Sequence, residues 1–139
     1  LKFAELGRVF SLQRDAGSNT LPPGAPIYDT ETGQASWEST VAVMSEMDYV
    51  VTNDTSTGHL AGVLGKKTLV LLPHAPHHYW LPFSPEVEPR GIPEVRPREI
   101  RGSYRALWYP NMNCFRQPKY NDWEGAVANA CAHIAQKTV

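Results

Sequence analysis

The stretch Tyr49-Val-Val-Thr-Asn-Asp-Thr-Ser-Thr-Gly-His-Leu-Ala-Gly-Val-Leu-Gly-Lys-Lys-Thr-Leu-Val-Leu-Leu72 predicts a strand, a turn, a helix and a second strand in direct succession. The first strand ends at Asp54, hydroxyl side chains suited to a helix cap follow, and Gly65 provides a left-handed stop for the helix. The apolar face of this helix is expected to hold Leu60, Val63 and Leu64. Residues 68–72 are almost continuously apolar, which is typical of a parallel strand covered on both faces. The stretch therefore predicts a βαβ unit and an α/β fold with a parallel sheet and flanking helices.

The turn between the first strand and the helix is the predicted binding site. Ligands of parallel sheets bind at the carboxyl ends of the strands, and a helix amino terminus offers N–H groups and a partial positive charge that suit a phosphate. The candidate residues are Asp54, Thr55, Ser56, Thr57, Gly58 and His59. Their hydroxyl and amide groups can bind a diphosphate without a glycine-rich loop, and Gly58 lets a bulky ligand approach the backbone.

Three side chains of this turn have alternative interpretations. A carboxylate repels phosphate, so Asp54 is expected to contact a sugar hydroxyl or to brace the turn; the alternative is that it only caps the helix. His59 can donate one N–H to a phosphate oxygen, or it is a packing histidine. Ser56 lies outside any Gly-x-Ser-x-Gly elbow, and neither a third group nor oxyanion donors are identifiable, so we reject a nucleophilic hydrolase.

The overall composition limits the class of protein. At 139 residues the chain is expected to form one domain, residues 1–139. Its net charge of -1 gives no support for binding to nucleic acid or to a membrane surface, and no apolar run reaches membrane length. Cys114 and Cys131 have no metal-type spacing, so we expect reduced thiols and a cytoplasmic protein. The chain opens at Leu1 without a Met or a signal-like leader, which suggests a fragment.

The first residues of the chain predict a second part of the same sheet. Residues 1–6 resemble the end of a helix with Gly7 as its stop, and residues 8–13 read as a strand. Gln13 and Arg14 follow at the carboxyl end of that strand. They either reach a ligand at the same edge as Asp54 or form a solvated turn.

Two more elements are expected before the central stretch. Residues 16–26 are rich in Gly, Ser, Asn and Pro and predict a loop, after which residues 26–29 can form a short strand at the sheet edge. Ser36 is suited to cap the next helix. The apolar residues of that helix are Trp37, Val41, Val43, Met44 and Met47.

Residues 73–112 form a predicted proline-rich irregular insertion, because nine of the twelve prolines lie between Pro73 and Pro118. Its histidines, His74, His77 and His78, have no carboxylate or cysteine at ligand spacing, so we predict no metal site. Its arginines are Arg90, Arg96, Arg98, Arg101 and Arg105, and they alternate with glutamates. A solvated loop is favoured over an arginine clamp for an anion, although loops of this length are often lids over a ligand or a partner.

The end of the chain predicts one strand and one helix. Residues 113–116 read as the last strand, and residues 121–124 start the final helix with a cap at Asn121. The apolar face of this helix is expected to hold Trp123, Val127, Cys131 and Ile134.

The central stretch, from Val50 to Pro73, resembles the C-terminal domain of family 9 glycosyltransferases, the heptosyltransferase-like group of GT-B fold. It is most similar to the bacterial tetratricopeptide-repeat proteins that end in such a domain. Other pieces resemble the same group in the same order: Ser11-Leu-Gln-Arg14, Trp108-Tyr-Pro110, Phe115-Arg-Gln-Pro118 and Asp122-Trp123.

This resemblance implies a Rossmann-like domain, the C-terminal half of a GT-B enzyme, that holds a nucleotide-diphosphate sugar. Asp54, Thr55, Ser56 and His59 match the motif that holds the diphosphate and the sugar. Gln13 and Arg14 would lie near the nucleoside. Transfer would need neither metal nor cofactor, because the helix dipole and hydrogen bonds would stabilise the leaving nucleotide. The acceptor is not identified.

Two parts of the family pattern do not precede Leu1 in this sequence. One is a first strand with a glycine-containing loop, and the other is an N-terminal domain that contacts the acceptor and usually supplies the catalytic base. We therefore expect this chain to be inactive by itself. The first strand would lie between the strands at Val9 and Val50, so those two either pair directly or leave a gap to be filled. Our hypothesis is that a second copy of the chain fills it and forms a homodimer.

Two alternative functions remain at this point. One is a degenerate transferase domain that serves as a binding or scaffold module without catalysis. The other is a GT-B sugar-nucleotide epimerase, which would use the same donor site and release a free sugar epimer.

Overall fold

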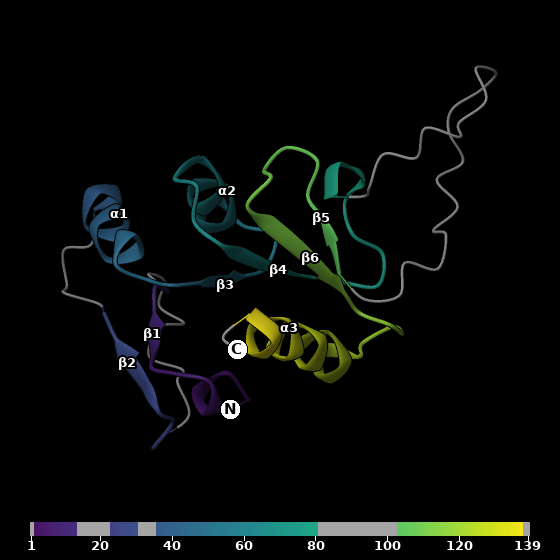
Figure 1. Cartoon of the computed structure of the whole chain (residues 1–139), viewed down its shortest axis with the longest axis horizontal. Coiled ribbons are helices and arrows are strands. Elements are labelled where there is room, and N and C mark those ends of the chain that lie inside the picture. Colours follow the sequence, from purple (N-terminus) through teal and green to yellow (C-terminus); the bar gives the residue numbers. More distant parts are fainter. Residues whose placement is uncertain (1, 14–22, 31–35, 81–102, 138–139) are drawn as a thin grey trace.

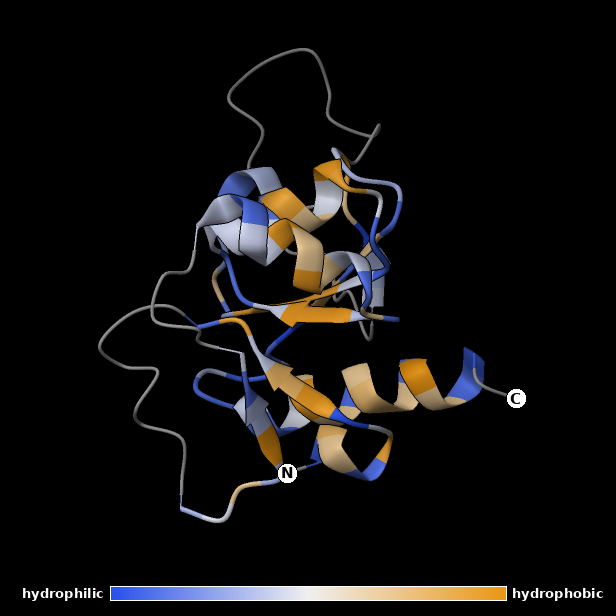
Figure 2. Cartoon of the chain, turned by 90° about the vertical axis from the view of Figure 1, so that its left-hand side faces the viewer, coloured by the Kyte–Doolittle hydropathy of each residue, from blue (hydrophilic) through white to orange (hydrophobic). Residues whose placement is uncertain are grey.

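The computed structural model describes residues 2–13, 23–30, 36–80 and 103–137. The elements in chain order are η1 (Lys2–Glu5), β1 (Val9–Ser11), β2 (Ile27–Asp29), α1 (Trp37–Ser45), β3 (Val50–Thr52), α2 (Ser56–Val63), β4 (Thr68–Leu72), η3 (His78–Trp80), β5 (Ser103–Arg105), β6 (Met112–Arg116) and α3 (Trp123–Lys137). They form three layers, with α1 and α2 on one face of the strands and α3 and η1 on the other (Figures 1 and 2).

The main sheet has four strands in the order β3-β4-β6-β5. β4 pairs in parallel with both β3 and β6, and β5 pairs antiparallel with β6 at the edge. β1 and β2 form a separate parallel pair. The predicted α/β class with a parallel sheet and flanking helices is therefore confirmed.

The central strand β4 explains why its sequence is apolar on both faces. Val70 and Leu72 pack in one cluster with Trp80 and Met112, while Leu69 lies in a second cluster on the other face of the sheet. That second cluster is closed by α3, whose Ala130 is fully buried. Each face of β4 therefore loses contact with water, which is the main stabilising contribution to the sheet.

The predicted apolar face of α2 is correct for Leu60, which packs against Val50 and Ala61, and wrong for Val63 and Leu64. Val63 is 75% exposed and Leu64 is 36% exposed, and the buried residues are Gly58, Ala61 and Gly62. Small side chains let the helix lie close against the strands, so packing distance rather than hydrophobic spacing selects the buried face. The predicted stop is correct, because Gly65 has a φ of +70°.

The caps of α1 and α3 were predicted with different success. Ser36 accepts a hydrogen bond from the Ser39 N–H at 3.2 Å, as expected for the cap of α1. At α3 the side chain that accepts from the first turn belongs to Asp122, which bonds the Gly125 N–H at 2.8 Å. The predicted cap, Asn121, instead adopts a left-handed φ of 62°. The face of α3 that is fully buried holds the small residues Ala126 and Ala130, whereas the expected Trp123 is exposed.

The remaining helices and strands differ from the predicted ones mainly at the two edges of the molecule. The expected helix end at residues 1–6 is one 3-10 turn, and Gly7 does not adopt a left-handed φ, so the predicted glycine stop is wrong there. β2 forms as expected and pairs with β1. β5 lies in the segment predicted to be irregular, because its pairing with β6 stabilises an extended chain that its own sequence does not specify. Arg14 and residues 81–102, which carry the clamp and lid hypotheses and include Arg90, Arg96, Arg98 and Arg101, lie outside the described residues.

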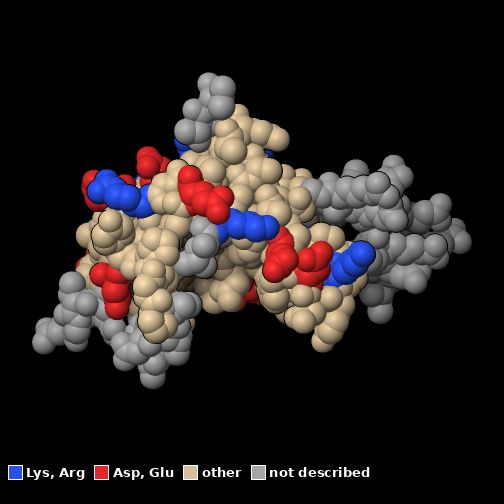
Figure 3. Space-filling view, turned by 90° about the horizontal axis from the view of Figure 1, so that it is seen from below, with Lys and Arg blue, Asp and Glu red and all other residues tan. Residues whose placement is uncertain are grey.

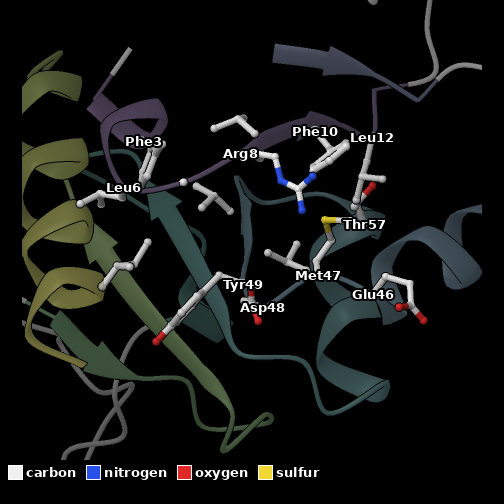
Figure 4. A pocket seen from close by; sticks show the side chains of 15 residues that line it. Phe3, Leu6, Arg8, Phe10, Leu12, Glu46, Met47, Asp48, Tyr49 and Thr57 are labelled. Atoms are coloured by element: carbon white, nitrogen blue, oxygen red, sulfur yellow. The ribbon is translucent and has the colours of Figure 1, made fainter. Parts of the chain in front are cut away.

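A gap separates the β1–β2 pair from the main sheet. In the described part of the chain, β1 pairs only with β2 and β3 pairs only with β4. Between β1 and β3 lies a cavity of about 560 Å³ (Figure 4). Phe3 and Leu6 lie at one end of it and Leu12 and Thr57 at the other. The two strands therefore do not pair directly.

Charged and thiol groups carry little further information about function. Acidic and basic side chains alternate on the face seen in Figure 3, without a continuous patch of one sign. Both cysteines are free thiols, and burial raises the pKa of Cys114 to about 12. Of the helices that the structure describes, none is long and apolar enough to cross a membrane.

Candidate functional site

The candidate site lies where β3 ends and α2 begins. Thr55 is the N-cap residue with extended backbone, and its carbonyl accepts bonds from the Gly58 and His59 N–H groups at 3.0 and 3.4 Å. Its hydroxyl makes no cap bond and instead lies 3.1 Å from the Thr52 hydroxyl. The N-cap residue therefore provides no hydroxyl cap, and its side chain does not compete with a ligand for the first-turn N–H groups.

Asp54 is not the cap of α2 either. Its carboxylate accepts from the Tyr79 hydroxyl, at 2.7 Å to Oδ1 and 2.9 Å to Oδ2. This hydrogen bond is the main reason why the pKa of Tyr79 is raised above its usual value of 10. The contact ties the end of β3 to η3, which follows the neighbouring strand β4. This geometry excludes the interpretation that the Asp54 carboxylate only caps α2.

His59 is held by aromatic residues on more than one side. Its ring stacks on Trp80 with centroids 5.3 Å apart and an interplanar angle of 25°. Its Nδ1 lies 3.1 Å from the Tyr109 hydroxyl. The ring is therefore oriented by packing and by one hydrogen bond, which fixes where its other nitrogen, Nε2, lies.

Gly62 explains how Tyr109 reaches His59 from the turn between β5 and β6. A Cβ atom at position 62 would lie 2.6 Å from two ring carbons of Tyr109 and 2.9 Å from Cε of Met112. The absence of a side chain at Gly62 lets the Tyr109 ring lie directly on α2. The Tyr109 hydroxyl contacts His59, which lies one turn nearer the amino terminus of α2.

The chain between β4 and η3 is hydrogen-bonded to the end of β6. Gln117 is buried, and its Oε1 accepts from the N–H groups of His74 and Asn121, both at 3.1 Å. The Arg116 guanidinium donates to the His74 carbonyl, and the His74 Nδ1 lies 3.2 Å from the Gln117 carbonyl. His74 therefore has a structural role. In the described ranges no three His, Cys, Asp or Glu side chains lie close enough to hold a metal ion.

Gln13 follows β1 and is exposed to solvent. Leu12, the residue before it, packs against a cluster that contains Val50 of β3 and Ala61 of α2. β1 therefore ends beside α2, at the same edge of the strands as the candidate site. Arg14 lies outside the described residues.

Sequence reasoning missed Tyr79, Trp80 and Tyr109 as parts of the site. A signal for the first two existed, because they follow β4 and the carboxyl ends of neighbouring parallel strands meet at one edge of the sheet. Tyr109 had no comparable signal. It reaches the site only because the β5–β6 turn packs on Gly62.

The fold and this arrangement define a parallel α/β domain with a candidate ligand site at the ends of β3 and β4. Residues 31–96, just under half of the chain, match the family model for Glycosyltransferase family 9 (heptosyltransferase). The match includes the whole Asp54–His59 turn and Tyr79. No curated protein and no solved structure matches the chain at a significant level.

Proposed function

We propose that this chain is the donor-binding half of a family 9 glycosyltransferase and binds a nucleotide-diphosphate sugar. The family match supports sugar transfer, and it spans the helix start where a diphosphate would bind. The single observation that carries the proposal further is the pair of oriented groups at this helix start. Asp54 and His59 are each hydrogen-bonded to a tyrosine hydroxyl, so a hydrogen-bond acceptor and a candidate donor are held in the same turn.

Each group of the turn has a proposed role. The diphosphate binds at the amino terminus of α2 through the hydroxyl and N–H groups of residues 55–58, where the helix dipole favours negative charge. The Tyr109 hydroxyl donates to Nδ1 of His59, which keeps the ring proton on Nε2, and Nε2–H then donates to a phosphate oxygen. Asp54 accepts hydrogen bonds from hydroxyls of the sugar. Gln13 and Arg14 contact the nucleoside.

The proposed reaction breaks the bond between the sugar carbon and the diphosphate as an acceptor oxygen attacks that carbon. The helix dipole and the hydrogen bonds stabilise the charge that develops on the leaving nucleotide. The base that removes the acceptor proton is proposed to come from another domain, so this chain alone binds donor without turnover. The proposed setting is the end of a bacterial tetratricopeptide-repeat protein in the cytoplasm. No acceptor is assigned.

An amide-resolved NMR titration with UDP, ADP and GDP tests the donor site. We expect saturable shifts of the amides from Asp54 to His59 and of Gln13 with one of the three nucleotides. Amides of α3 on the opposite face of the sheet should not shift and serve as the internal control. If none of the nucleotides shifts the turn in a folded sample, the donor-binding proposal is wrong.

Two measurements separate the rival functions. Turnover of a nucleotide sugar by a longer parent protein excludes a non-catalytic scaffold, since a degenerate domain binds without transfer. Analysis of the product distinguishes a transferase from an epimerase, because only the epimerase releases a free sugar epimer.

A His59→Ala variant removes the side chain that is proposed to donate a hydrogen bond to a phosphate oxygen. It should weaken nucleotide binding about tenfold, as expected for the loss of one hydrogen bond to a charged group.

The proposed partner for the cavity between β1 and β3 is a second copy of the chain. Among the described residues neither strand has a pairing partner on the edge that faces this cavity, and unpaired edges are templates for pairing with another chain. We expect sedimentation velocity to show a dimer whose fraction increases with concentration. A strictly monomeric profile at high concentration contradicts this part of the proposal.

A further inference from the structure

The hydrogen bond between Tyr79 and Asp54 joins two side chains that differ in their exposure to solvent. Asp54 lies in the exposed turn before α2, and Tyr79 is a half-buried residue of η3. One hydroxyl is shared between the two carboxylate oxygens, at 2.7 and 2.9 Å. A carboxylate offers about four lone-pair positions, so this single donor does not satisfy it fully.

A better set of donors for this carboxylate is a pair of neighbouring hydroxyl groups. Each hydroxyl of such a pair can donate to one carboxylate oxygen, which gives two charge-assisted bonds in place of one shared bond. Neighbouring hydroxyls are the common feature of the sugars that a nucleotide-sugar donor carries. The Tyr79 phenol thus makes, with one O–H, the contact that the sugar would make with two.

The Tyr79 hydroxyl can leave Asp54 while η3 stays anchored to the core. The neighbouring residue, Trp80, is only 1% exposed and packs against His59 and the cluster around Val70 and Leu72, so it anchors η3. The hydroxyl of Tyr79 lies at the exposed end of its ring, against the exposed Asp54. The Tyr79 ring packs at the border of the same cluster, 5.4 Å from the Trp80 ring between centroids, so a small rotation that keeps this packing is enough to separate its hydroxyl from Asp54.

We propose that Tyr79 is a specificity-determining residue whose hydroxyl holds the position on Asp54 that a pair of neighbouring sugar hydroxyls takes when the donor binds. This inference rests on the proposed function and deepens it, because it names Tyr79 as the group that the sugar hydroxyls replace on Asp54. The site then discriminates by exchange: a nucleoside diphosphate without a sugar leaves the Tyr79 contact intact, whereas a sugar with suitable hydroxyls replaces it.

The Tyr79→Phe variant tests this exchange because it removes the hydroxyl and keeps the ring. Calorimetry measures the affinities of wild type and variant for three matched pairs: UDP and UDP-glucose, ADP and ADP-glucose, GDP and GDP-mannose. For the pair that binds, we expect the variant to bind the nucleotide sugar roughly three- to tenfold more tightly, because the phenol no longer competes. Its affinity for the free diphosphate should stay unchanged.

A second readout follows the Tyr79 hydroxyl directly. The Asp54 hydrogen bond raises the Tyr79 pKa, so loss of this bond should return the pKa toward 10. An alkaline titration of tyrosine labelled with ¹³C at Cζ should show this decrease with the nucleotide sugar and not with the free diphosphate. Asp54→Asn should lower the Tyr79 pKa without any ligand. A purely structural role of Tyr79 produces none of the ligand-dependent changes.

The outcomes distinguish this inference from the proposed function. If free diphosphates bind but Tyr79→Phe affects diphosphate and nucleotide sugar alike, or affects neither, the inference is wrong and the donor site stands. The same holds if the variant weakens binding of the nucleotide sugar, since the phenol would then contact the sugar instead of making way for it. If no nucleotide binds wild type or variant, the proposed function is wrong, and the inference is wrong with it.

Discussion

Replacing Trp80 by alanine is expected to lower the free energy of unfolding by about 3–5 kcal/mol. Its side chain is 1% exposed and lies in the cluster with Val70, Leu72 and Met112, so alanine leaves a large cavity on the α2 face of the sheet. The same substitution removes the surface on which His59 stacks. Nucleotide binding should therefore decrease together with stability. Denaturant unfolding and the nucleotide titration measure the two effects.

Trp108→Ala is the matched control for Trp80→Ala. Trp108 is 64% exposed, so its removal should change the free energy of unfolding by less than about 1 kcal/mol. Trp80→Phe should be far milder than Trp80→Ala, because it keeps an aromatic ring and removes an indole N–H that has no hydrogen-bond partner among the described residues. Equal losses for Trp80→Ala and Trp108→Ala would show that η3 is not anchored as described.

Replacing Gly62 by alanine is expected to lower the free energy of unfolding by about 1–3 kcal/mol. A Cβ atom 2.6 Å from the Tyr109 ring forces that ring away from α2. Alanine improves helix propensity by about 1 kcal/mol, so a net loss of stability would mean that the clash outweighs that gain. As the Tyr109 ring moves, its hydroxyl leaves Nδ1 of His59, and the affinity for the nucleotide should fall as well. Denaturant unfolding and the ¹⁵N signals of the His59 ring report the two consequences.

Gly7→Ala is the control for Gly62→Ala, since a Cβ at position 7 meets no atom within 4 Å. It should leave stability unchanged or raise it slightly by restricting the unfolded chain. In a double-mutant cycle, Gly62→Ala and Tyr109→Ala should be strongly non-additive, because the two closest contacts of a Cβ at position 62 are with the ring that the second substitution removes. Additive effects would contradict the role of Gly62 as the space for Tyr109.

Much of the central βαβ unit could be predicted from local sequence. The strand before Asp54, the stop at Gly65 and the apolar strand up to Leu72 are all where the pattern predicted them. The buried face of α2 could not be predicted in this way. Its burial depends on how closely the helix approaches the strands, and small residues such as Gly58 and Gly62 carry no hydrophobic signal.

The candidate site shows the same division. The turn from Asp54 to His59 was predicted to be the binding site, because a helix start after a parallel strand is suited to bind a ligand. Its orienting partners, Tyr79 and Tyr109, lie 25 and 50 residues away in the sequence. Only the packing of η3 and of the β5–β6 turn brings them to Asp54 and His59.

By itself the sequence determined the class of fold, the central βαβ unit and the position of the candidate site, because strands, turns and helix stops depend on neighbouring residues. The tertiary structure alone decided the α2 face that is buried, the pairing of β5, the gap between β1 and β3 and the partners of Asp54 and His59. These features depend on contacts between residues far apart in the chain. Such contacts form when whole elements pack, and they leave no periodic pattern in the sequence.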